Sequence, residues 1–373
     1  MKILFSGENF YPAKSGAEYS ILTLFEKLKE DHELEAICTG NKTEMIIHNM
    51  IKIHRVNTPF TYSPSWIKRY FLNRVWAKYL DILFKKKNYD FVLTQTTVVP
   101  STVEMAKKHK IPVLVFVRSQ EHFCLSNLRD VKIMEKHNCL KYATWKYKIQ
   151  YPFFKRIIKW HIKALKKADF LAANSNFIQN ITKKWYGLDS VVIYPFFIFD
   201  DYRVEKKSPE YITLIRPEIH KGVEIFIKIS KRMPKRKFLA VGNTDRKREL
   251  MRTKNIKYIP WTHNMKEIYM QTKILLVPSI MPESFGRITV EAMCNEIPCI
   301  VSNMGALPED INEAGIIIKN IFDIDSWIEA IEKFDDDNFY KKMSKKSLKQ
   351  AEKFDFKIQY KNFEKIVKKI ESV

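Results

Sequence analysis

Short apolar segments alternate with longer segments of helical periodicity along this chain, and the alternation runs through it twice. The first series of predicted strands comprises residues 2–6, 34–38, 91–94, 113–117, 170–173 and 191–194. The second series comprises residues 211–215, 237–241, 274–278 and 298–302. Strands separated by helices favour parallel sheets with right-handed crossovers. The pattern therefore predicts an α/β fold with two doubly wound sheets.

An irregular segment bounded by prolines, residues 195–209, separates the two series and is interpreted as a linker. The length of 373 residues agrees with two domains of about 150 residues each. We therefore predict domains over residues 1–195 and 196–354, with a C-terminal helix over 355–373 that packs back on the first domain. Two such Rossmann-like domains would face a central cleft, because ligands of doubly wound sheets bind beyond the carboxyl ends of the strands.

The cysteines and the N-terminus indicate a cytoplasmic protein. The chain has five cysteines and no CxxC pair, which favours reduced thiols over a disulfide scaffold. The N-terminal segment turns polar after five residues, which is too short for the apolar core of a signal peptide. No apolar run reaches the roughly 18 residues of a membrane-spanning helix. Any membrane contact is therefore expected at the surface of the bilayer.

The net charge of +23 is concentrated in one part of the chain. Residues 51–170 hold 25 basic and 7 acidic side chains. Within them, residues 63–87 predict an amphipathic helix, and residues 139–167 predict two helices broken near Pro152.

Both basic segments mix lysine and arginine with aromatic residues. In 63–87 the apolar positions expected on one helical face are Trp66, Tyr70, Val75, Leu80 and Leu83. Such helices suit an anionic membrane surface, where rings settle at the headgroup level and lysines meet anionic lipid. Core-packing helices with a solvated basic face explain the pattern equally well. Nucleic-acid contact is the weakest alternative, because no nucleic-acid-binding signature accompanies the charge.

Two carboxylates stand out in the segment 275–306. Glu283 is expected in a loop after a buried strand, and Glu291 eight positions further along, on the helix that follows. Carboxylates accept hydrogen bonds from vicinal hydroxyl groups, as in sugars and riboses. Gly286 permits a close backbone approach, and the start of the helix offers free N–H groups to a phosphate. The segment therefore suits a ligand that carries both hydroxyl and phosphate groups.

Two cations, Arg216 and Lys221, follow the first strand of the second series and are expected at the same sheet edge. Fixed cations suit a leaving diphosphate, whose negative charge grows as its bond to carbon breaks. This arrangement needs no metal. A string that resembles a metal-binding signature, Asp323-Ile324-Asp325, directly precedes a helical segment and is better explained as a helix cap.

These segments together resemble the retaining glycosyltransferase family 4, whose members have the GT-B fold and a motif of two glutamates separated by seven residues. The matching parts of this chain are Arg216 with Lys221 and Gly222, residues 241–242, residues 278–279, residues 282–293 and residues 304–309. Several matches in the right order carry the resemblance, which is strongest over 211–320 and weakest over 41–110. It assigns the acceptor to the first domain and a nucleotide-sugar donor to the second.

The resemblance also implies roles for individual residues. Glu283 would contact the transferred sugar, and Glu291 would hold the ribose hydroxyls of the donor. Arg216 and Lys221 would neutralise the diphosphate. The implied donor-binding residues besides Glu291 are Ser284, Phe285, Gly286 and Gly242, with backbone N–H groups of 284–286 placing the sugar and phosphate.

The first domain departs from the family pattern in two places. Ser15, Gly16 and Ala17 match a Gly-Gly loop near the phosphate and acceptor, but Ala17 has a Cβ and resists the positive φ that glycine tolerates. After the strand 113–117, Arg118 stands where many members carry a histidine. Arg118 would steady the sugar or diphosphate, and His122 is the alternative candidate for the same role.

The function expected from these features is glycosyl transfer with retention from a UDP- or GDP-sugar, without a metal or other cofactor. The expected acceptor is a lipid-linked or polysaccharide intermediate at the inner face of the cell membrane, met through the segments 63–87 and 139–167. Three alternatives remain: a GT-B enzyme with a small soluble acceptor, a sugar-nucleotide epimerase of the same fold, and a basic nucleic-acid-binding protein.

Overall fold

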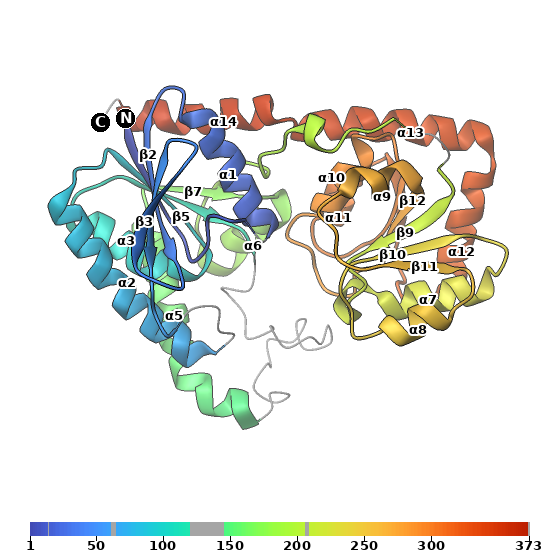
Figure 1. Ribbon diagram of the computed structural model, residues 1–373, viewed down its shortest axis with the longest axis horizontal. Helices are drawn as coiled ribbons and strands as arrows, with labels where there is room; N and C mark the ends of the chain where they lie inside the picture. Colours follow the sequence, from blue (N-terminus) through green and yellow to red (C-terminus); the bar gives the residue numbers. More distant parts are fainter. Residues whose placement is uncertain (14, 61–64, 120–144, 206–208, 372–373) are drawn as a thin grey trace. The chain divides into compact units, whose positions relative to one another are not determined.

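A computed structural model describes residues 1–13, 15–60, 65–119, 145–205 and 209–371. The chain divides into two compact units, the first made of Met1–Phe196 with Gln359–Val373 and the second of Phe197–Ile358. Each unit is built on a single sheet with helices on its faces (Figure 1). The predicted α/β class with two parallel, Rossmann-like sheets is confirmed.

The sheet of the first unit has the strand order β3-β4-β2-β1-β5-β6-β7-β8. Its strands are β1 (Lys2–Ser6), β2 (Glu33–Thr39), β3 (Glu44–His48), β4 (Ile51–Val56), β5 (Phe91–Gln95), β6 (Val113–Val117), β7 (Phe170–Ala173) and β8 (Val191–Val192). All pairs are parallel except β3 with β4, which form an antiparallel pair at the edge. The sequence pattern missed β3 and β4, because β3 has only three apolar residues between polar ends and β4 alternates apolar with polar residues.

Five helices accompany this sheet along the described part of the first 196 residues. They are α1 (Gly16–Leu28), α2 (Trp66–Lys86), α3 (Val99–Lys108), α5 (Trp145–Lys167) and α6 (Asn176–Tyr186). Residues of α2, α3, α5 and α6 share one hydrophobic cluster with the sheet, so these helices lie on the same face (Figure 1). Strand β1 connects the two faces of the core, because Phe5 packs on Phe25 of α1.

The basic helices differ in two respects from the expectation. Helix α2 buries the row Leu72, Trp76, Leu80 and Phe84, whereas Val75 and Leu83 are only half-buried. The apolar face is therefore rotated from the one predicted.

The expected break near Pro152 is wrong, because α5 is one helix with that proline inside it. A proline inside a helix costs roughly 3 kcal/mol. Phe154 and Ile157 are buried against Trp66 of α2 just beyond the proline, and this packing holds the helix together. Residues 139–144 lie outside the described residues.

The sheet of the second unit has the order β11-β10-β9-β12-β13-β14, and all its pairs are parallel. Its strands are β9 (Tyr211–Ile215), β10 (Phe238–Val241), β11 (Ile256–Ile259), β12 (Thr272–Val277), β13 (Cys299–Ser302) and β14 (Gly315–Ile318). The edge strands β11 and β14 were not predicted.

The helices of the second unit cover both faces of this sheet. They are α7 (Val223–Arg232), α8 (Lys247–Arg252), α9 (Met265–Gln271), α10 (Arg287–Met293), α11 (Leu307–Ile311), α12 (Ile324–Glu332) and α13 (Asp337–Ala351). Buried residues of α7, α8 and α12 form one cluster with the sheet, and α9, α10 and α11 lie on the opposite side (Figure 1). Asp323 caps α12 by accepting the N–H of Asp325 at 3.1 Å, as predicted.

The predicted linker and C-terminal helix adjoin the boundary between the units. Phe197 and Phe199 in the linker are buried, so this segment is packed rather than open. The final helical segment is divided at Asp355 into α13 and α14 (Phe356–Glu371). In α14, the Gln359 side chain accepts the N–H of Tyr194 at 3.1 Å. Among the described residues, no helix has both the length and the apolar character needed to cross a membrane.

Candidate functional site

The carboxyl ends of three neighbouring strands, β10, β9 and β12, bring three loops to one edge of the second sheet. Gly242 follows β10, Arg216 follows β9, and the loop with Glu283 follows β12. Parallel strands place such loops side by side, and ligands of doubly wound folds bind at this edge. Gly242, Arg216 and Glu283 therefore belong to one region of the fold.

Glu283 and Lys221 form an ion pair in this region. Lys221 ends the short 3-10 turn η4 (Ile219–Lys221), and its Nζ lies 2.5 Å from Glu283 Oε1. Ser279 donates its hydroxyl to the same oxygen at 2.6 Å. Burial opposes ionisation of Glu283, but the Lys221 charge and the hydrogen bonds from Lys221 and Ser279 outweigh it and lower the pKa of that carboxyl. The site therefore holds a preformed carboxylate and ammonium.

The backbone beside Glu283 is fixed by Gly305. Gly305 has a φ of +69°, and a Cβ at this position would lie 2.1 Å from the Glu283 carbonyl oxygen. The N–H of Ala306 donates to that same carbonyl at 2.8 Å. A glycine is required here both for its left-handed backbone and for the close approach of the Glu283 strand segment.

Gly305→Ala is therefore expected to lower the melting temperature and to reduce transfer by more than about tenfold, because Glu283 must move. The matched control is Gly187→Ala, where φ is +66° but no atom lies within 4 Å of the added Cβ. The control has only the left-handed backbone cost of about 1–2 kcal/mol. Equal losses of stability in the two variants, measured by thermal unfolding, would show that the close approach does not constrain the loop.

Glu291 lies in a second, separate cluster within the same unit. Its Oε1 accepts from Arg287 Nε at 2.9 Å, and its Oε2 accepts from the Tyr269 hydroxyl at 2.5 Å. Arg287 Nη2 also donates to the Tyr202 hydroxyl at 2.6 Å, and the guanidinium lies 4.3 Å from the centre of the Phe197 ring. Each carboxylate oxygen has a second lone pair, so Glu291 can still accept from two hydroxyl groups.

The charges in this cluster support one another. Burial and the negative charge of Glu291 raise the pKa of Tyr269 well above its ordinary value, so its hydroxyl remains a donor. Burial disfavours the charged form of Arg287, but Glu291 and Tyr202 outweigh it and raise the pKa of the guanidinium. The carboxylate of Glu291 is thus held in one orientation from two sides.

Several of these partners were missed in the sequence. Arg287 is four residues before Glu291 on α10, and this spacing is a recognised ion-pair signal on helices. Tyr202, Tyr269 and Ser279 come from other elements, and nothing local in the sequence marks them.

The backbone N–H groups of the loop 284–286 were expected to bind the sugar and phosphate, but the N–H of Gly286 already has a partner within the protein. The N–H of Gly286 donates to Asp310 Oδ2 at 2.7 Å and is not available to a ligand. A Cβ on Gly286 would lie 2.7 Å from Leu307 Cδ2, so the close approach comes from this unit's own packing. Phe285 is buried against Phe354, with ring centroids 5.5 Å apart, and Ser284 is half-buried.

Asp310 is a buried acid that the sequence analysis did not single out. It is fully buried, and this burial raises the pKa of its carboxyl well above the ordinary value. The carboxyl supports the Gly286 backbone by accepting its N–H.

Arg216 adopts a left-handed backbone with φ of +59° directly after β9. Its Nη2 lies 2.9 Å from Glu218 Oε1, and the side chain is half-exposed. Gly242, with φ of +120°, allows the two loops to approach, because its added Cβ would lie only 3.3 Å from Arg216 Cα. The Gly242 carbonyl accepts from Tyr258 at 2.9 Å. Arg216 is thus held at the sheet edge by an exposed partner that an anion can replace.

Of the two candidates predicted after the strand 113–117 of the first unit, only Arg118 lies among the described residues. Arg118 follows β6 and is buried, with its Nε donating to Gln95 at 2.9 Å and its guanidinium 4.5 Å from the Phe116 ring. His122 lies outside the described residues, so its role stays a prediction.

The expected loop near Ser15 is largely helical. Gly16 and Ala17 are the first two residues of α1, and the N–H of Ser15 donates to Glu18 at 3.0 Å. A helical backbone has negative φ, so the Cβ of Ala17 causes no strain there.

Comparisons with known proteins agree with this arrangement. A family model described as Glycosyltransferase Family 4 matches residues 14–198, and one described as Glycosyl transferases group 1 matches residues 196–353. A search of curated proteins finds no significant match.

Solved structures match over nearly the whole chain at low identity. Sucrose-phosphate synthase from Thermosynechococcus elongatus has a TM-score of 0.79 and 15 % identity, covering 100 % of this chain and 99 % of that one. Anabaena HepE in complex with UDP and glucose has a TM-score of 0.73 and 14 % identity, covering 99 % of each chain. WaaG, a glycosyltransferase of lipopolysaccharide biosynthesis, has a TM-score of 0.69 and 14 % identity, covering 96 % and 98 %. The chain is therefore a family 4-like glycosyltransferase with the GT-B fold.

Proposed function

We propose that this enzyme transfers a sugar, with retention of configuration and without a metal, from a UDP- or GDP-sugar to a lipid-linked or polysaccharide acceptor. The observation that carries the donor part is the ion pair of Lys221 with Glu283, which is largely buried beside Arg216 at the carboxyl edge of the second sheet. A fixed cation and a fixed carboxylate at one sheet edge suit a substrate that has both a diphosphate and sugar hydroxyls.

In this proposal the diphosphate lies against Arg216 and Lys221. As the bond between the anomeric carbon and the diphosphate breaks, negative charge grows on the leaving oxygen, and the two cations stabilise it. Arg216 releases Glu218, its exposed partner, to reach the anion. Glu283 accepts hydrogen bonds from the transferred sugar.

Retention follows from attack on the face from which the diphosphate leaves. The acceptor oxygen forms the new bond to the anomeric carbon, and its proton passes to the departing phosphate oxygen. No strong enzymic base is then needed. Arg118, or His122 in its place, would steady the sugar or the diphosphate from the first unit.

The choice of donor is supported by solved structures of HepE in complex with UDP-glucose and with UDP. The similar structures do not agree on one class of acceptor. WaaG is named for lipopolysaccharide biosynthesis, which supports a lipid-linked acceptor, whereas sucrose-phosphate synthase supports a small soluble acceptor as the second candidate. The basic helices α2 and α5 favour the first candidate, with the enzyme on the inner face of the cell membrane.

A donor screen by thermal unfolding tests the proposal. A UDP- or GDP-sugar that binds the folded state is expected to raise the melting temperature. At a hundredfold excess of the donor over its Kd, the free energy of unfolding increases by about 2.7 kcal/mol through mass action. ADP- and dTDP-sugars serve as matched controls of similar charge. If no nucleotide sugar shifts the transition, the donor assignment is wrong.

Transfer is also expected to persist in excess EDTA, because Arg216 and Lys221 supply the positive charge that a metal would otherwise bring. The measurement is the initial rate of transfer with and without the chelator. A rate that falls to background and returns on addition of Mg²⁺ would contradict the role given to the two cations.

A further inference from the structure

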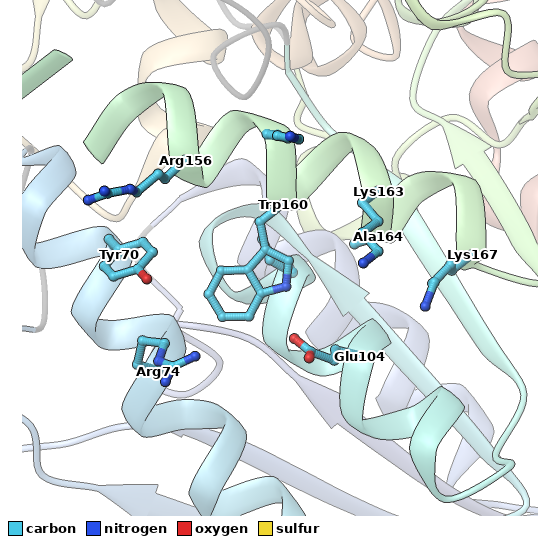
Figure 2. Close-up of a pocket in the computed structure, with 10 residues that line it drawn as sticks. Tyr70, Arg74, Glu104, Arg156, Trp160, Lys163, Ala164 and Lys167 are labelled. Atoms are coloured by element: carbon cyan, nitrogen blue, oxygen red, sulfur yellow. The ribbon is translucent and has the colours of Figure 1, made fainter. Parts of the chain in front are cut away.

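A pocket of about 380 Å³ lies in the first unit among helices α2, α3 and α5, formed by residues outside the donor site. Figure 2 shows Trp160 projecting from α5 into this pocket, with Tyr70 and Arg74 on the α2 side and Glu104 on the α3 side. The volume is within the range of small-ligand pockets, roughly 300–1,000 Å³. The lining residues are Tyr70, Arg74, Pro100, Glu104, Arg156, Lys159, Trp160, Lys163, Ala164 and Lys167.

The pocket is strongly positive. Five of its lining residues are cations, and Glu104 is the single carboxylate among them. Among the residues that the structure describes, none of the five cations forms an ion pair. Two nearby lysines of α3 differ, because Lys107 pairs with Asp169 and Lys108 with Asp81, each at 2.7 Å. The pocket therefore gathers five cations and one carboxylate, so it has a net positive charge.

The helical spacing explains this concentration. Arg156, Lys163 and Lys167 follow one another at intervals of seven and four residues, so they lie on one face of α5. Arg74 faces them from α2 (Figure 2). Like charges that line one pocket repel one another and favour an anion between them. A phosphate group suits this position, because an arginine guanidinium can donate two parallel hydrogen bonds to two phosphate oxygens.

The floor of the pocket is aromatic. Trp160 and Tyr70 are half-buried and make an edge contact, with ring centroids 6.2 Å apart. Aromatic side chains surrounded by lysine and arginine suit a molecule that has both an anionic head and an apolar part. A nucleic acid would instead need a row of cations along successive phosphates.

We propose that this pocket binds the phosphate headgroup of an anionic membrane lipid and so holds the first unit at the bilayer surface. The inference rests on the membrane location proposed above and not on the chemistry of transfer. The phosphate lies among Arg74, Arg156, Lys163 and Lys167, and the glycerol and first acyl carbons lie against Trp160.

The test compares two triple variants of the full chain in sedimentation with vesicles of phosphatidylglycerol and phosphatidylcholine. The pocket variant is Arg156→Gln, Lys163→Gln and Lys167→Gln. The matched control is Lys148→Gln, Lys155→Gln and Lys166→Gln, which removes three exposed charges from another face of the same helix. Vesicles of phosphatidylcholine alone give the background.

The pocket variant is expected to partition on the order of 100-fold more weakly, at about tenfold or less per charge. The control variant is expected to change by only a few-fold. Equal losses in both variants would overturn the proposal, because binding would then follow net charge and not the pocket. An unchanged pocket variant would overturn it as well.

Two further arms separate other sources of phosphate. A melting temperature of the wild type that rises with millimolar inorganic phosphate, without any pocket-dependent binding to the vesicles, would show that the site takes free phosphate and not a lipid. Tighter binding of duplex DNA, lost in the pocket variant, would show a nucleic-acid site instead. Both variants are expected to keep the donor-induced rise in melting temperature, because the donor residues belong to the second unit. If the donor does not raise the melting temperature of the wild-type protein, the donor assignment is wrong, but the proposed lipid site in the pocket is not tested by that result.

Discussion

Replacing Glu283 by glutamine is expected to lower the rate of glycosyl transfer by two to three orders of magnitude while the protein stays folded. The substitution keeps the shape of the side chain but removes the charge that pairs with Lys221. Glutamine has one acceptor oxygen where the carboxylate has two, so the contacts with Ser279 and with the sugar can no longer be made together. Lys221 also loses the partner that fixes its position for the diphosphate.

The measurement is the single-turnover rate, accompanied by the melting temperature of each variant. The control is Glu249→Gln, which removes the carboxylate of an exposed ion pair with Lys231 in the same unit. Exposed pairs contribute about 0–1 kcal/mol, so this control should leave both rate and stability close to wild type. A Glu283→Gln enzyme with near-wild-type turnover would remove Glu283 from the site.

Replacing Glu291 by glutamine is expected to have two effects, a loss of stability and a higher KM for the donor. Arg287 is largely buried and would keep its charge without its carboxylate partner. Breaking a buried pair in this way costs about 3–5 kcal/mol. The donor would lose one charge-assisted contact with the ribose, which is worth about 1.5–3 kcal/mol and raises the KM about 10- to 150-fold.

A double variant separates these two effects. In Glu291→Gln with Arg287→Met the buried cation is removed as well, so much of the stability should return. Donor affinity should not return, because the carboxylate is still missing. If the double variant binds the donor as tightly as wild type, Glu291 supports the fold and has no contact with the ribose.

The central strands of both sheets could be predicted from the sequence because they are buried on both faces. Strand β6 is a continuous apolar run, and β12 is apolar from Ile274 to Val277, which is typical of parallel strands covered by helices. The missed strands lie at or beside the sheet edges: β3, β11 and β14 are edge strands, and β4 pairs with β3. In β4 and β11 polar residues interrupt the apolar ones, so these strands lack the continuous apolar run. The continuity of α5 through Pro152 could not be predicted either, because it depends on packing against Trp66, a residue 86 positions earlier in the sequence.

The candidate site likewise combines residues that the sequence indicated with partners that only the tertiary structure shows. The order of motifs along the chain marked Arg216, Lys221 and Glu283, which follow strands, and Glu291, which lies on the next helix. It did not indicate that Gly286 donates to Asp310, or that Tyr269 and Tyr202 hold the second carboxylate and its arginine. These partners come from separate elements that only the folded chain brings together.

The sequence by itself determined the α/β class, the two sheets and the residue types at the site, because periodicity and local motifs are properties of neighbouring residues. The tertiary structure decided which charges meet. Lys221 and Glu283 are 62 residues apart and pair only because β9 and β12 are adjacent in the sheet. It also showed that the basic residues of α2 and α5 include five cations around one pocket that have no ion-pair partner among the described residues. Pairing and burial depend on distances across the fold, and these distances are set by packing and not by local sequence.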